Sequence, residues 1–290
     1  MAFDLSTLGS YVDEQRLPLI KKSVLGAKTI GLINLQTGVK HSSALNLLDI
    51  NPVIQAGGCG WTAQGDAKIS QRVLVADNYK VNMSLCYKDL LNTFLGFEVR
   101  AGLTQNSTSF DEYITSGVID GVNAKIEKNI WQGDKDNAGE FDGFLSILAE
   151  DAITATGTGA YNAIKSAYEK IPVSILDKAV IFCGSDTFRS LMLEMVEKNL
   201  YHYSANGADT QEFILPGTNT KVIATNGLNG SNKVVAADPM NLFYGTDMLD
   251  DAETFEFVYD KTTREYRVIV EFNAGVQVAF PDEVVVGTVA

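Results

Sequence analysis

The chain has 290 residues, of which 46% are hydrophobic and 20% are charged, and its formal net charge is −13. A chain of this length buries enough apolar surface to fold without a structural metal or a set of disulfides. So acidic a balance excludes a protein that grips nucleic acid through clustered Lys and Arg, although it permits one that encloses it. No apolar run approaches the roughly eighteen residues of a membrane span and no secretory signal is recognisable, so we expect no membrane contact and a soluble product of the cytoplasm.

The first forty residues predict an arm followed by an extended segment. A short amphipathic stretch surrounds Pro18, and GLINLQTG is typical of a strand that ends at Gly38. Because this part carries too little apolar surface for a core of its own, we expect it to pack on something else.

The stretch GGCGWTAQGD, residues 57–66, raises the question of a phosphate-binding loop, because Gly58, Gly60 and Ala63 satisfy the pattern G-x-G-x-x-A. That pattern binds a dinucleotide only where a helix follows and offers its N-terminal amides. Here a strand follows, with Tyr79, Val81, Met83 and Leu85 alternating with polar residues. We therefore predict a long two-stranded excursion whose glycines let its tip bend.

A long amphipathic helix is predicted over residues 108–130. Apolar residues recur at every fourth position: Phe110, Ile114, Val118, Val122, Ile126 and Ile130. Thr108 and Asp111 fit a capping box. Gly117 and Gly121 each weaken a helix, so we expect them where another element approaches closely.

The remaining chain predicts a mixed subdomain and then a β-rich return. The acidic loop with Asp134, Asp136 and Glu140 fails the EF-hand pattern, because Ala138 and Leu145 stand where oxygen ligands are needed. Helices over 158–171 and 185–200 alternate with short strands, which is typical of an α/β or α+β unit. The last forty residues alternate aromatic and polar residues on both sides of the turn DKTT, and VQVAF after Gly275 predicts one further strand. We expect this meander to pack on the long helix.

The candidates for chemistry are few. In IFCGSDTF, Cys183 or Ser185 could act as a nucleophile, with His202 as the nearest base in sequence. The simpler interpretation is that Ser185 caps the following helix and Cys183 is a small core residue. Cys59, Cys86 and Cys183 form no C-x-x-C pair, which favours free thiols over a metal site or disulfides. We expect no catalytic residue, cofactor or metal.

The order of arm, glycine-tipped hairpin, long helix, inserted α/β subdomain and β return resembles the Hong Kong 97 fold of tailed-bacteriophage major capsid proteins. The region TGVKHSSALNLLDINPVIQAGGCGWTAQGDAKISQRVLVADNYKVNMSLCYKDL is similar to the N-arm and E-loop of such proteins, particularly those of Bacteroidetes-infecting phages. EFNAGVQVAFPDEVVV is similar to their closing strand in the peripheral (P) domain. The resemblance implies an α+β fold with these parts: an N-terminal arm (1–48), an extended E-loop (49–86), a P domain with its spine helix (87–150), an inserted axial (A) domain (151–247) and P-domain return strands (248–290).

The resemblance also implies a function. The chain would be a structural subunit, not an enzyme, whose hexamers and pentamers form the icosahedral head shell around double-stranded DNA. It would be assembled in the host cytoplasm, would reside in the virion, and would meet scaffolding, portal and possible decoration proteins. Its E-loop would contact a neighbouring subunit through Trp61, Gln64, Asp66, Lys68 and Arg72. Two alternatives stay open: an encapsulin-type shell of a cellular nanocompartment, and an α/β enzyme that uses Cys183 or Ser185.

Overall fold

The computed structural model describes residues 27–55, 57, 59, 65–86, 110–198, 212–247, 254–263 and 265–290. Its helices are α4 (Phe110–Gln132), α5 (Phe144–Ile147), α6 (Ala160–Glu169) and α7 (Ser185–Glu197). Its strands are β1 (Asn34–Thr37), β2 (Ser42–Pro52), β3 (Gly65–Val75), β4 (Asp77–Cys86), β5 (Ile153–Gly157), β6 (Val180–Gly184), β7 (Glu212–Ile214), β8 (Lys221–Thr225), β9 (Lys233–Ala237), β10 (Leu242–Thr246), β11 (Thr254–Asp260), β12 (Glu265–Val278) and β13 (Val285–Val289). Three short 3₁₀ turns, η1 (Asn226–Leu228), η2 (Pro239–Asn241) and η3 (Pro281–Glu283), connect them. The predicted α+β class is therefore correct.

The body sheet is built around β12. Along its described strands the order is β1-β10-β12-β11, and β4 also pairs with β12, antiparallel and over Glu265–Ala274. The predicted break at Gly275 is wrong, because β12 runs through this residue without interruption. A Cβ at Gly275 would lie 1.9 Å from the carbonyl oxygen of Val75. The glycine therefore permits a close crossing of the end of β3 over β12 rather than ending a strand.

The main hydrophobic core lies between α4 and this sheet, as predicted. Val118, Val122, Ile126 and Ile130 are buried with alternate residues of β12 in one cluster. The expectation for Gly117 and Gly121 is wrong: within the described residues, no atom lies within 4 Å of a Cβ built at either position. Both glycines are exposed, because the apolar face of α4 points the other way. Thr108 lies outside the described residues.

The α/β lobe is a second unit with its own core. Its sheet has the order β5-β13-β9-β6-β8-β7, with α6 and α7 packed on it. Two strands pair in a different unit from the one predicted for them. β10 pairs with β1 and β12 in the body sheet, and β13, the final strand, pairs with β5 and β9 in the lobe. The boundaries predicted at 151–247 and 248–290 thus differ from the units in which these strands pair.

The predicted arm is described from residue 27 onward and packs on both units. Ala27, Ile30 and Ile33 are buried in the main core. Thr29 is buried as well, and its hydroxyl accepts a hydrogen bond from Nε1 of Trp131 at 2.8 Å. This segment depends on the rest of the chain for its burial, as expected.

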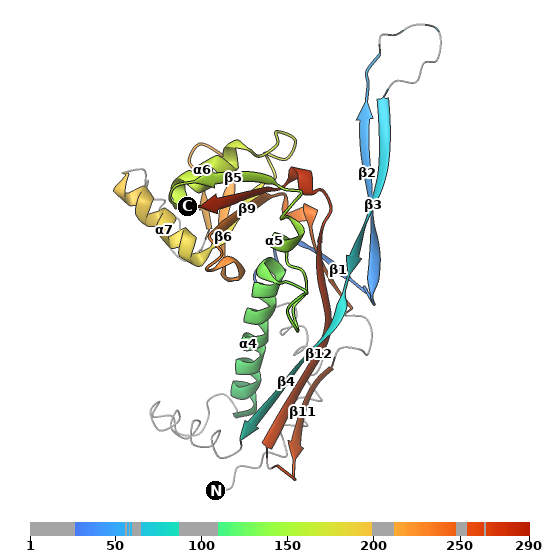
Figure 1. The fold of residues 1–290 in the computed structure, drawn as a ribbon, viewed down its shortest axis with the longest axis vertical. Helices are drawn as coiled ribbons and strands as arrows, with labels where there is room; N and C mark the ends of the chain where they lie inside the picture. The colour runs from blue at the N-terminus through green and yellow to red at the C-terminus, as the bar shows by residue number, and fades with distance from the viewer. Residues whose placement is uncertain are drawn as a thin grey trace.

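The hairpin of β2 and β3 stands apart from the other described elements (Figure 1). It projects beyond the lobe and the body sheet, whereas β4 returns into the body and pairs with β12. The predicted excursion is confirmed, with the difference that its second strand is Gly65–Val75 and not the alternating stretch around Tyr79. The alternating stretch places Tyr79, Val81 and Leu85 half-buried, while Met83 is exposed.

Candidate assembly surface

The projecting hairpin has two chemically different faces. In its register Ala44 lies opposite Val73 and Leu48 opposite Ile69, and residues directly opposite one another in an antiparallel pair share a face. These four side chains and Val75 make up what we call the apolar face. Two polar pairings interrupt it: Ser42 lies opposite Val75, and the side chains of Asn46 and Gln71 form a hydrogen bond of 3.1 Å with each other.

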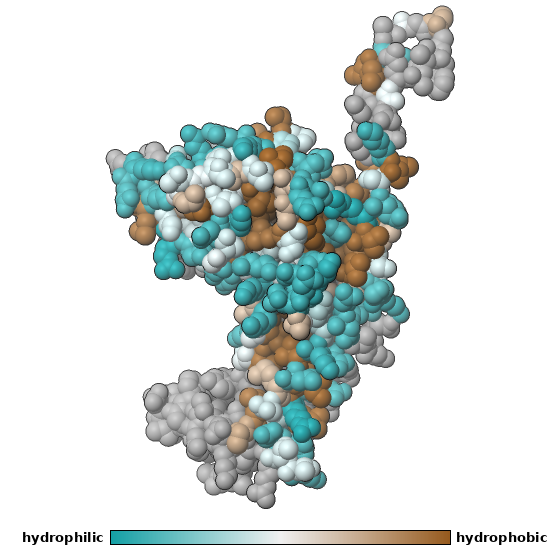
Figure 2. Space-filling model, in the orientation of Figure 1, coloured by the Kyte–Doolittle hydropathy of each residue, from teal (hydrophilic) through white to brown (hydrophobic). Residues whose placement is uncertain are grey.

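The apolar face is open to solvent. Leu48 is 57% exposed, Ile69 80%, Val73 48% and Val75 44%. Figure 2 shows hydrophobic groups along the projecting hairpin and at its root. Near the tip, Val53 is half exposed and Ile54 is 99% exposed. Each of these positions leaves apolar area in water, and burying that area against a partner would gain about 25 cal/mol of free energy per Å².

The opposite face is buried at its root, and farther out it carries the half-buried Leu47 beside polar side chains. Leu45 and Leu74 pack with Val39 and Ala76 in a small cluster that attaches the hairpin to the body. Ser70 and Lys68 follow toward the tip and are exposed. An isolated two-stranded hairpin is marginally stable in water, so this root cluster is what makes the projection possible.

Of the five predicted E-loop contact residues, three are described by the structure and two are not. Trp61 and Gln64 lie outside the described residues. Asp66 occupies the start of β3 opposite Asn51, and Lys68 is exposed opposite Asp49. Arg72 lies at the root, where its guanidinium donates to groups of its own chain.

The residues of the apolar face were missed at the sequence level. The alternation that identifies them is present in KISQRVLV, where Ile69, Val73 and Val75 fall on one face. What the sequence lacked was the register with β2, which places Leu48 beside Ile69.

A hollow of about 250 Å³ continues the apolar face into the body. Val73 and Val75 line it together with Phe141, Ile147 and Tyr79. Burial raises the pKa of Tyr79 to about 12, with contributions from two nearby carboxylates, so its phenol stays neutral. The hollow is therefore walled mostly by uncharged side chains.

The polar rim of this hollow comes from the loop after α4. Lys135 and Asp142 form an ion pair of 3.2 Å there. The loop's acidic residues are engaged by backbone amides: the N–H of Asp136 donates to Asp134 at 3.0 Å and that of Asp134 to Glu140 at 3.3 Å. The described residues include no group of three or more His, Cys, Asp or Glu placed to hold a metal ion.

The two candidate nucleophiles of the enzyme alternative, Cys183 and Ser185, lie in the described part of the lobe, and neither is activated there. Cys183 is fully buried in β6, as predicted for a core residue. Burial, together with the nearby carboxylate of Asp186, raises the pKa of its thiol to about 12 against the lowering effect of Lys28. A thiol of that pKa is not a nucleophile at neutral pH.

Ser185 has a structural role that differs from the predicted one. Helix α7 begins after Gly184, and Ser185 does not cap it. Its hydroxyl instead donates to Oδ1 of Asn226 at 2.8 Å. Asp186 accepts the backbone N–H groups of Thr187 and Gly230, so IFCGSDTF ties β6 and α7 to the loop around η1. His202 lies outside the described residues.

The lobe carries exposed apolar side chains of its own. Leu193 and Val196 lie on the outer surface of α7, Val173 follows α6, and Ile214 lies on the edge strand β7. None of the helices in the described ranges is long and apolar enough to cross a bilayer. Scattered exposed apolar residues are ordinary on a protein surface, so the hairpin remains the better candidate site.

Comparison with known proteins identifies the fold. No protein-family model and no curated protein matches the sequence. Among solved structures, the chain is similar to a subunit of the satellite phage P4 procapsid, with 11% identity, a TM-score of 0.61, and coverage of 100% of this chain and 92% of that chain. It is similar to the capsid of an empty GTA particle, with 11% identity, a TM-score of 0.59 and coverage of 93% and 90%. It is also similar to a virus-like particle from Pyrococcus furiosus, with 10% identity, a TM-score of 0.54 and coverage of 94% and 97%. The chain has the α+β fold of capsid shell proteins.

Proposed function

We propose that this chain, which has the fold of capsid shell proteins, is the major subunit of an icosahedral phage head. It self-assembles into hexamers and pentamers that enclose double-stranded DNA, and it needs no catalytic residue, cofactor or metal for that role. The observation that carries the proposal is the projecting hairpin with its exposed apolar face. A monomer gains nothing from holding such a surface in water, whereas a shell subunit buries it against a neighbour.

The shape of the molecule favours a head-to-tail contact. The hairpin projects away from its own body (Figure 1), so it can reach over the body of a neighbouring copy. A contact between two different surfaces of one chain is heterologous, and repetition about an axis closes it into a ring. Rings of this kind are the hexamers and pentamers of the proposal.

Each part of the fold takes a role in this proposal. We assign the arm to 1–48, the E-loop to 49–86, the P domain with its spine helix to 87–150, the A domain to 151–247 and the return strands to 248–290. The strand pairing supports a hairpin that begins at Ser42 and ends at Val75, and a β13 that belongs with the A domain. Trp61, Gln64, Asp66, Lys68 and Arg72 remain the predicted polar and aromatic contacts of the E-loop, beside the apolar face.

The acidic composition suits a container for DNA. With 23 basic against 36 acidic residues, the chain offers little net attraction to phosphates. A lining that bound DNA tightly through Lys and Arg would resist both packaging and release. We therefore infer enclosure without sequence-specific binding, assembly in the host cytoplasm with scaffolding and portal proteins, decoration proteins as possible additional partners, and a final place in the virion.

A cellular compartment shell of the encapsulin type is the second candidate. It is favoured by the similarity to a virus-like particle whose chain is covered to 97%. The content of purified particles separates the two candidates: phage heads made with their packaging partners contain double-stranded DNA, whereas a compartment shell encloses a cargo protein.

The test is electron microscopy and solution mass of the purified protein, alone and with its scaffolding partner. We expect hollow shells, or rings of five and six subunits. Leu48→Asp combined with Ile69→Asp should abolish them while leaving the circular dichroism spectrum and melting temperature unchanged, because both side chains are exposed in the subunit.

The matched control is Leu193→Asp combined with Val196→Asp, which adds the same two charges at similarly exposed apolar positions on α7. Shells that form normally from the hairpin double variant would contradict the role of the apolar face. A protein that stays a compact dimer under all conditions, with its scaffolding partner present, would contradict the shell function itself.

A further inference from the structure

The direction of the hairpin is decided over a few residues at its root. β3 and β4 form one extended run interrupted only at Ala76, with β4 held in the sheet by β12 and β3 leaving it. Ala76 is buried, and its backbone N–H donates to the carbonyl of His41 at 2.8 Å. The extended run crosses Gly275 so closely that a Cβ there would collide with Val75. Ala76 and Gly275 therefore mark the pivot of the hairpin.

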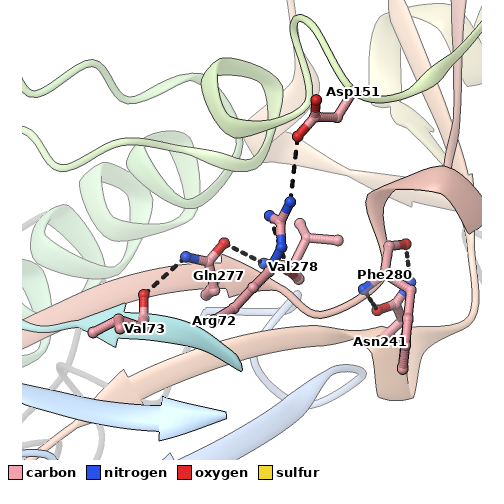
Figure 3. Close-up of polar contacts among 7 residues, drawn as sticks. All are labelled: Arg72, Val73, Asp151, Asn241, Gln277, Val278 and Phe280. Atoms are coloured by element: carbon pink, nitrogen blue, oxygen red, sulfur yellow. Dashed lines mark hydrogen bonds and ion pairs between the residues drawn. The ribbon is translucent and has the colours of Figure 1, made fainter. Parts of the chain in front are cut away.

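Beyond this pivot, Gln277 and Arg72 make polar contacts between β3 and the rest of the protein, in addition to the apolar root cluster (Figure 3). Nε2 of Gln277 on β12 donates to the carbonyl of Val73 at 2.9 Å, which keeps β3 beside the sheet. Nη1 of Arg72 donates to the carbonyl of Val278 at 3.4 Å, and its Nη2 donates to Asp151 at 3.3 Å.

Arg72 differs from Gln277 in what it connects. Asp151 lies just before β5, the first strand of the lobe, while Val278 is the last residue of β12. Arg72 thus joins the hairpin, the body sheet and the lobe through one planar guanidinium, whose donors have a fixed geometry. Figure 3 shows its side chain extended from β3 between these two partners.

We propose that Arg72 is the positioning residue of the hairpin: its bonds to Asp151 and Val278 set the direction in which the hairpin projects and couple that direction to the lobe. This inference rests on the proposed function for its purpose, because a shell subunit must present the same hairpin at positions that are not equivalent.

The contact is suited to adjustment. The side chains of Arg72 and Asp151 are 30% and 57% exposed, and exposed ion pairs contribute little to stability. The Arg72–Asp151 pair therefore favours one direction of the hairpin, and little free energy is needed to break the pair and let the hairpin turn. A shift of the lobe moves Asp151, and the hairpin follows or is released.

The experiment measures the direction on the dilute, unassembled subunit. Spin labels are placed at exposed positions on the tip, the lobe and the body sheet through Ile54→Cys, Val173→Cys and Val258→Cys, two at a time. Cys59 and Cys86 are exposed and are replaced by Ser, while Cys183 is buried and stays. Pulsed dipolar spectroscopy then gives the distance distribution for each pair.

In the Arg72→Ala variant, we expect both tip distances to broaden and their means to shift by more than the width of the parent distribution. The distance between lobe and sheet should stay unchanged. Arg72→Asp alone should have the same effect, and adding Asp151→Arg should narrow the tip distances again relative to either single change. The proposal would be overturned if the tip distances were unaltered in Arg72→Ala. It would also be overturned if the double variant Arg72→Asp/Asp151→Arg did not have narrower tip distance distributions than the single changes.

The control is Lys165→Ala, which removes an exposed ion pair of 3.8 Å with Glu169 on α6. It should leave all three distances unchanged. Because the measurement requires no assembled particle, it decides the role of Arg72 even where electron microscopy contradicts the shell function.

Discussion

Glu127 shows how a single residue holds three segments together. It lies on the buried side of α4 and accepts the backbone N–H and the hydroxyl of Thr29, at 3.0 and 2.5 Å. The backbone N–H of Gly227, from the loop of the lobe, also faces this carboxylate and favours its charged form. Burial raises the pKa of this carboxyl, against the opposing effects of the Thr29 bonds, Lys28 and Gly227.

The raised pKa gives a pH dependence of known sign. Glutamate in the unfolded chain titrates near about 4.3, and the folded protein holds this proton more tightly. The stability due to Glu127 is therefore complete below that pH and is lost as the pH rises through the higher folded pKa. Glu127→Gln cannot ionise, so its free energy of unfolding should improve relative to the parent as the pH rises.

Urea denaturation at a series of pH values measures this difference. Glu169→Gln, the same substitution at an exposed position at the end of α6, serves as the control. A parent-to-variant difference that is constant across the acidic range would contradict the assignment to Glu127.

At the scale of elements, two glycines lower the stability of helix α4, and the packing of its buried face does not require either of them. Gly117 and Gly121 are exposed in the helix interior, and the described residues leave space for a Cβ at each. Alanine at either position should stabilise the subunit by about 0.8–1 kcal/mol, since glycine has the lower helix propensity. Thermal or urea denaturation of the single variants checks this. Gly275→Ala, where backbone blocks the Cβ, should instead destabilise.

The same glycine variants probe what α4 meets after assembly. If Gly117→Ala stabilises the subunit but blocks shell formation, a neighbouring subunit approaches α4 at that point. Normal shells would show that the glycines make no contact in the particle.

At the scale of the whole molecule, burial of the apolar face and repulsion between copies of charge −13 oppose each other. Sulfate strengthens the burial of apolar surface, and added salt screens the repulsion. We therefore expect ammonium sulfate to lower the protein concentration at which particles form, as measured by light scattering. Assembly that weakens steadily with added salt would instead indicate that ion pairs between subunits drive it.

The sequence by itself determined the elements whose signal is local. The four-residue spacing of Val118, Val122, Ile126 and Ile130 located α4, because one turn of helix places these residues on a single face. Alternation from Tyr266 to Phe272 located the first half of β12 for the corresponding reason in a strand. The order of these elements was enough for the resemblance to capsid proteins, which the similarity of fold supports.

The tertiary structure decided what depends on partners distant in the chain. β10 and β13 are each five residues long, and the sequence of such a short apolar strand does not indicate which sheet it joins. The apolar face of the hairpin depends on the register between β2 and β3, because a shift of one residue would move every side chain of a strand to the opposite face. Arg72, expected at a contact between subunits, binds Asp151 of its own chain, 79 residues away. Spacing and alternation record the neighbours of a residue along the chain, whereas pairing, register and ion pairs are set by the packing of segments that the sequence places far apart.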